Sequence, residues 1–75
     1  MEMNEKNVIR LFNESGSYGV FNIFKNYKET PKDDLSKKIF NVMNDLEFKL
    51  YGEITIIKEI SNIIMYHLNL EKLKK

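Results

Sequence analysis

The chain has 75 residues, no cysteine and a nearly balanced charge, because 12 basic side chains oppose 11 acidic ones. This length is typical of one domain, so we expect residues 1–75 to form a single unit. The absence of cysteine excludes disulfides and thiolate metal sites. The net charge of +1 argues against a protein that holds nucleic acid by strong overall positive charge. Apolar residues make up 43% of the chain, which is enough for a packed core.

Lysine supplies 11 of the 12 basic residues, and asparagine and isoleucine are abundant. We interpret this composition as AT-rich coding bias, which indicates a low-GC bacterium or its phages and mobile elements. The first residues contain no apolar leader stretch, so we expect a cytoplasmic protein. The most apolar run, 54–70, contains Lys58, Glu59 and His67, and these polar groups predict that it does not span a membrane.

Two short helices are predicted in the first third of the chain. The first covers residues 5–13, and the side chain of Asn4 is expected to cap its free amides. Gly16 is expected to end this helix in a left-handed conformation. The second helix covers residues 18–27, where apolar residues recur on one face after Ser17 as the cap.

Two longer helices are predicted to follow. One covers residues 31–47, because Thr30 can cap it and Pro31 suits its first turn. Residues 48–52 leave two interpretations open, either an extension of this helix to Gly52 or a short apolar loop. The last helix covers residues 54–70, and its apolar face is about 160° wide, more than a surface helix needs. That face consists of Ile56, Ile57, Ile60, Ile63, Ile64, His67, Leu68 and Leu70.

These patterns predict an all-α fold, a compact four-helix domain of the SAM-like or orthogonal type, packed around the C-terminal helix. Within residues 17–64, an aromatic segment is followed by the sequences LSKKIF, DLEF and EIS. In this order they resemble the YozE-type family of small bacterial helical proteins with a SAM-like fold. The resemblance implies a compact four-helix fold and no catalytic residues.

Residues with catalytic or ligand-binding chemistry are sparse. His67 is the only histidine, and Glu71 lies one turn later, but two ligands are too few for a metal site. The Gly/Ser turn 15–19 precedes a helix, yet it lacks the lysine and the spacing of a phosphate-binding loop. We therefore predict that the protein is not an enzyme and has no catalytic residues, no cofactor, no metal and no small-molecule substrate.

Nucleic-acid binding is kept as an alternative function. The densest basic stretch surrounds the connection before the third predicted helix, in a layout similar to a helix-turn-helix. Asp33 and Asp34 stand at the start of that helix and would repel phosphates. The candidate contacts are Lys25, Lys28, Lys32, Lys37 and Lys38.

Protein interaction is the favoured function. Four large side chains fall outside the predicted apolar stripes of their helices, namely Phe40, Tyr51, Met65 and Tyr66. Large apolar side chains left outside a core often mark an interface, with a second copy or with another protein. The sequence therefore predicts a small interaction module. In the most concrete version, it is a mobile-element protein that binds and modulates a host enzyme.

Overall fold

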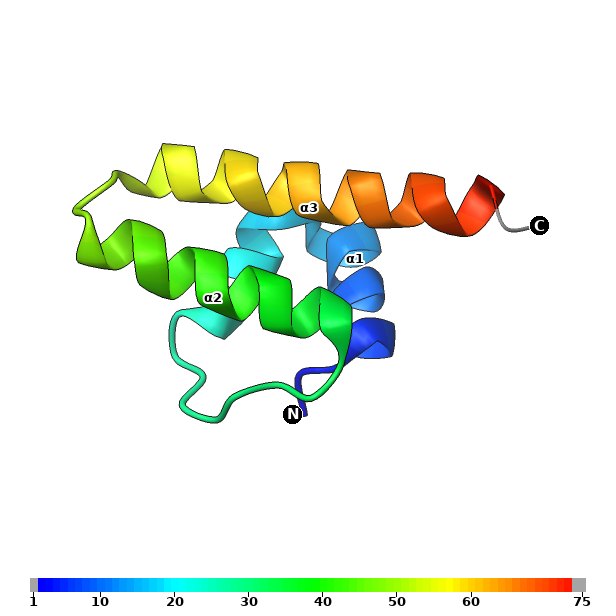
Figure 1. Cartoon of the computed structure of the whole chain (residues 1–75), viewed down its shortest axis with the longest axis horizontal. Helices are drawn as coiled ribbons and strands as arrows, with labels where there is room; N and C mark the ends of the chain where they lie inside the picture. Colours follow the sequence, from blue (N-terminus) through cyan, green and yellow to red (C-terminus); the bar gives the residue numbers. More distant parts are fainter. Residues whose placement is uncertain (1, 74–75) are drawn as a thin grey trace.

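The structure is a computed structural model that describes residues 2–73, and these form three helices. α1 spans Glu5–Phe24, α2 spans Asp34–Phe48 and α3 spans Glu53–Leu73. α2 and α3 run antiparallel beside each other, and α1 packs across this pair (Figure 1). α3 contacts both other helices extensively, whereas α1 and α2 contact each other less. The predicted all-helical composition is therefore confirmed.

The predicted number of four helices is wrong, because the predicted helices 5–13 and 18–27 fall in one helix, α1, which ends at Phe24 and not at residue 27. Gly16 adopts φ 68° and ψ −170°, which bends the helix without ending it. The residues after Gly16 return to helical geometry, so a single residue with positive φ produces a kink and not a separate element. Gly19 allows the two halves to approach closely, since a Cβ there would lie 2.4 Å from the Cβ of Ser15.

α1 and α2 each begin directly after a residue whose side chain caps the free backbone amides of the first turn. Asn4 caps α1 as predicted, because its side-chain oxygen accepts a hydrogen bond of 2.9 Å from the backbone N–H of Asn7. α2 begins later than predicted, because Asp33 and not Thr30 is its cap. The Asp33 carboxylate accepts a hydrogen bond of 3.0 Å from the backbone N–H of Ser36. Aspartate is a stronger cap than threonine, which explains why α2 begins at Asp34 and not at Pro31.

One hydrophobic core fills the space between the three helices. α3 contributes Ile56, Ile60 and Ile64, all buried, which confirms that its isoleucine face is central to the core. Leu70 was predicted on the same face but is exposed, since α3 extends past the end of α2 there (Figure 1). No helix within residues 2–73 combines the length and the apolar character needed to cross a membrane.

Ile60→Ala tests the central role of α3. The side chain of Ile60 is fully buried, so its truncation leaves a cavity and lowers the free energy of unfolding by about 2–5 kcal/mol. Urea denaturation measures this loss. Ile54→Ala is the matched control, because Ile54 is exposed on the same helix and its truncation is expected to change stability by less than about 0.5 kcal/mol. Equal effects of the two substitutions would contradict the assigned core.

Candidate partner-binding site

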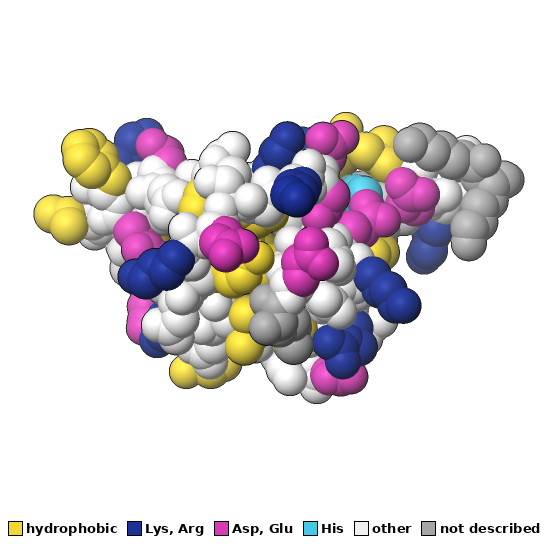
Figure 2. Space-filling model, turned by 90° about the horizontal axis from the view of Figure 1, so that it is seen from below, with side chains coloured by type: hydrophobic (Ala, Val, Ile, Leu, Met, Phe, Trp, Pro, Cys, Tyr) yellow, Lys and Arg dark blue, Asp and Glu magenta, His cyan; other side chains and the backbone are white. Residues whose placement is uncertain are grey.

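An exposed apolar cluster covers one end of the molecule, where α2 connects to α3. It consists of Phe48, Leu50, Tyr51 and Ile54, and we call it the tip. Each of these residues exposes between 52% and 90% of its surface, although they lie within seven consecutive residues. Figure 2 shows hydrophobic side chains gathered at this end of the molecule. Side chains of this size and exposure present roughly 500 Å² of apolar surface in total.

The tip is shaped by the way in which α2 ends. The backbone N–H of Tyr51 donates to the carbonyl of Leu46, and that of Leu50 donates to the carbonyl of Glu47, both at 3.0 Å. This pair of hydrogen bonds defines a Schellman motif, in which the residue after the cap adopts a left-handed conformation. That residue is Leu50, with φ 63°, where glycine is the usual choice. Of the two interpretations of residues 48–52, the extension of the helix to Gly52 is wrong, because α2 ends at Phe48, and the short apolar loop is confirmed for residues 49–52.

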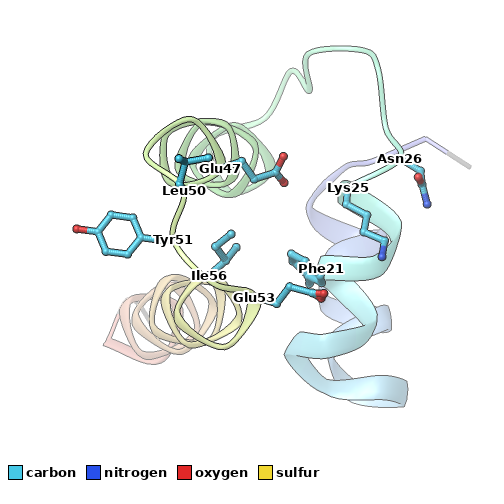
Figure 3. A pocket seen from close by; sticks show the side chains of 8 residues that line it. All are labelled: Phe21, Lys25, Asn26, Glu47, Leu50, Tyr51, Glu53 and Ile56. Carbon is cyan, nitrogen blue, oxygen red and sulfur yellow. The ribbon is translucent and has the colours of Figure 1, made fainter.

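A groove runs beside the tip, between the end of α1 and the α2–α3 connection (Figure 3). We call it the tip groove, and its volume is about 470 Å³. Buried Phe21 and Ile56 form its floor, while Leu50 belongs to its wall. The ring of Tyr51 points away from α1, so this residue joins the groove to the outer surface of the tip. The complete lining is Phe21, Lys25, Asn26, Glu47, Leu50, Tyr51, Glu53 and Ile56.

Charged groups stand on both sides of the tip groove. Glu47 and Glu53 extend from the α2–α3 side toward α1 (Figure 3), and neither forms an ion pair with another residue of the described chain. The ammonium group of Lys25 lies 5.6 Å from the centre of the Phe21 ring, a cation–π arrangement. The groove therefore has an apolar floor and a rim with two carboxylates and one ammonium group.

The four residues that the sequence marked as an interface do not form one surface. Tyr51 belongs to the tip and lines the groove. Phe40 is half-buried and packs against the core. Met65 and Tyr66 are exposed, but they lie in the second half of α3, far along that helix from the tip. One of the four candidates, Phe40, therefore packs against the core, and the other three lie on two separate surfaces.

Sequence reasoning missed Phe48, Leu50 and Ile54 as surface residues. The signal was present in the apolar run from Phe48 to Tyr51, which ends at Gly52 and has no helical periodicity. A run that short is compatible with a buried segment as well as with an exposed one, so the sequence did not distinguish them. The decisive feature is the left-handed backbone at Leu50, which is a property of the folded connection.

His67 lies in an acidic environment at the other end of the molecule. Its Nε2 atom is 2.9 Å from the Oε1 atom of Glu5, and no hydrogen bond of good geometry joins them. Both residues line a cavity of about 520 Å³ together with Asp33, Asp34, Lys38, Leu70 and Glu71. Within residues 2–73, no group of three or more histidine, aspartate or glutamate side chains is arranged to hold a metal ion.

The five lysines of the alternative nucleic-acid site are all exposed. Lys25 lines the tip groove, and Lys28 lies in the loop between α1 and α2. Lys32 lies in the same loop, whereas Lys37 and Lys38 lie in the first two turns of α2. Lys38 shares its cavity with carboxylates, which lower the positive potential that a phosphate would meet. The connection between α1 and α2 is a nine-residue loop, 25–33, longer than the turn of a helix-turn-helix.

The chain matches no protein-family model, no curated protein and no solved structure.

Leu50→Gly tests the strain at the end of α2. Glycine adopts the left-handed conformation readily, whereas a residue with a Cβ pays about 1–2 kcal/mol there. The matched control is Leu50→Ala, which removes the same exposed side chain but keeps a Cβ. We expect the glycine variant to be about 1 kcal/mol more stable than the alanine variant in urea denaturation. A more stable alanine variant would show that position 50 is not left-handed in solution.

His67→Gln tests whether the histidine has more than a supporting role. Glu5 is half-exposed, and ion pairs of this kind contribute little to stability. Glutamine keeps a nitrogen that can donate to the Glu5 carboxylate. We expect the free energy of unfolding to change by less than about 1 kcal/mol, and added Zn²⁺ to leave the melting temperature of both proteins unchanged. A rise with Zn²⁺ in the wild type alone would reveal a metal site at His67.

Proposed function

We propose that the protein is a non-enzymatic interaction module whose contact surface is the tip together with the tip groove. The observation that carries this proposal is Leu50. Its side chain is 90% exposed, and its backbone is held in a left-handed conformation that is unfavourable for leucine and that glycine adopts readily. Neither the core nor the helix end benefits from leucine at this position.

Strained backbone at an exposed position is typical of functional surfaces. The surroundings of Leu50 support the same conclusion, because Phe48 and Ile54 are also exposed and the groove beside them has an apolar floor. Burial of such side chains against a partner removes apolar surface from water and supplies the free energy of association. Two rim carboxylates favour a partner that presents basic groups next to its apolar residues.

The sequence also suggested that the partner is a host enzyme and that the chain comes from a mobile element. This version stays a prediction, because it depends on chain size and inferred origin. The tip defines the surface on which such a partner would bind.

A photo-crosslinking experiment tests the proposed surface. Replacing Phe48 with a benzoyl-phenylalanine places the reactive group on the tip, because Phe48 is 87% exposed. Tyr18 is the matched control position, since it is an exposed aromatic residue that does not line the tip groove. In the cytosol of a low-GC bacterium, we expect covalent protein adducts from position 48 and none from position 18.

A second variant links the adducts to the groove. Adding Leu50→Gly removes an apolar side chain from the groove wall and keeps the backbone, because glycine adopts the same left-handed conformation. The yield of covalent protein adducts from position 48 is therefore expected to fall at least about tenfold. Equal adducts from positions 48 and 18, or none from position 48, would contradict the proposed function.

A further inference from the structure

We infer that the tip binds the tip of a second copy of this chain, in a two-fold pair in which Leu50 of each copy enters the tip groove of the other. The inference rests on the proposed function of the tip and names its partner. Its basis is that one surface carries both halves of a contact, an exposed apolar projection and an apolar groove beside it. A two-fold interface requires such a self-complementary surface, because the same patch of both copies forms the contact.

The projection and the groove lie side by side at the same end of the molecule. Leu50 is 90% exposed and belongs to the groove wall. The floor of the groove consists of Phe21 and Ile56, and its volume of about 470 Å³ leaves room for a leucine side chain. In the single chain Leu50 faces water, whereas in the pair it covers the apolar floor of the other copy. The burial of both leucines removes apolar surface from water.

The charges on the groove walls select one orientation of the pair. Glu47 and Glu53 stand on the wall formed by α2, α3 and their connection, whereas Lys25 stands on the α1 wall (Figure 3). A two-fold axis that runs along the groove exchanges the two walls, so the acidic wall of each copy lies over the Lys25 wall of the other. An axis across the groove would place acidic wall on acidic wall, which is unfavourable.

The three charged groups are available for such a contact. Within residues 2–73, none of Glu47, Glu53 and Lys25 forms an ion pair. The ammonium group of Lys25 lies 5.6 Å from the centre of the Phe21 ring, so it stands next to the apolar floor. A second copy therefore presents a basic group beside apolar residues, which is the chemistry that the two rim carboxylates favour. The pair contains this contact twice, once on each side of the axis.

The area of the tip determines how strong the pair can be. The exposed side chains of the tip present roughly 500 Å² per copy, so two copies bury roughly 1,000 Å². This area is at the lower limit for a specific protein pair, and the dissociation constant is expected to be on the order of 100 µM. A two-fold contact uses the tip of both copies, so association stops at the dimer.

Sedimentation velocity on the purified 75-residue chain tests this inference, over a range from about 10 µM to about 1 mM. The mean mass of the wild type is expected to rise with concentration and to level off at that of a dimer. Leu50→Glu places one charge from each copy in the contact, so this variant is expected to dimerise at least about tenfold more weakly. Met65→Glu is the matched control, because Met65 is exposed in the second half of α3, away from the tip, and this variant is expected to dimerise like the wild type.

Three results would overturn the inference. They are a wild type that stays monomeric, a mean mass that rises above that of a dimer, and a Leu50→Glu variant that dimerises like the wild type. Circular dichroism is expected to show the same helix content for all variants, because Leu50 and Met65 are exposed and contribute little to the core.

Exchanging the wall charges tests the orientation of the pair. Lys25→Glu sets acid against acid and Glu47→Lys sets base against base, so each variant alone is expected to dimerise at least about fivefold more weakly. An equimolar mixture is expected to form heterodimers about as strong as the wild-type dimer, because the new carboxylate of one chain faces the new ammonium group of the other. Lys32→Glu is the control, since Lys32 is exposed outside the groove. A mixture that associates no better than its components would contradict the two-fold arrangement.

The crosslinking experiment separates this outcome from the proposed function. If the purified wild type is monomeric while position 48 crosslinks to a different protein in cells, the second copy is not the partner and the tip is still a contact surface. If position 48 crosslinks to nothing and the wild type is monomeric, both proposals fail. Adducts of position 48 with a second copy support both.

Discussion

The contact of α3 with both other helices is the interaction on which the rest of the structure depends. Ile56, Ile60 and Ile64 lie one turn apart and are buried, so a single stripe of α3 is covered by α1 and α2 together. A chain of this size buries a small fraction of its surface compared with larger domains, so its stability depends on few such contacts. Each of the other two helices contacts α3 more extensively than it contacts the other.

The same arrangement explains why apolar side chains remain exposed at both ends of the molecule. α3 is longer than α2, with 21 residues against 15, and α1 crosses the pair instead of running along it (Figures 1 and 3). The covering helices therefore protect the middle of α3 and leave its last turns in solvent. At the opposite end, the connection 49–52 is itself part of the tip, and its residues Leu50 and Tyr51 remain exposed. The uncovered surfaces follow from helix length and crossing geometry.

The kink at Gly16 has a structural role in this geometry. A straight helix of 20 residues would contact the α2–α3 pair over a short stretch and then leave it. The bend allows Val8 in the first half of α1 and Val20 in the second half to be buried in the same core. Phe21 and Phe24 follow Val20 into the core, and Phe21 thereby becomes the floor of the tip groove. The position of the groove floor thus depends on a glycine five residues before Phe21 in the same helix.

The sequence by itself determined the features that depend on neighbouring residues. The helical class follows from apolar periodicity, the Asn4 cap from the chemistry of one side chain, and the central stripe of α3 from isoleucines one turn apart. The tertiary structure decided the features that depend on distant residues. Gly16 is a kink and not an end, because both halves of α1 find space on the same helix pair. Leu70 and Leu50 are exposed although they are as apolar as Ile60, because burial requires another part of the chain to cover a side chain, and the neighbouring segments leave 41% of Leu70 and 90% of Leu50 uncovered.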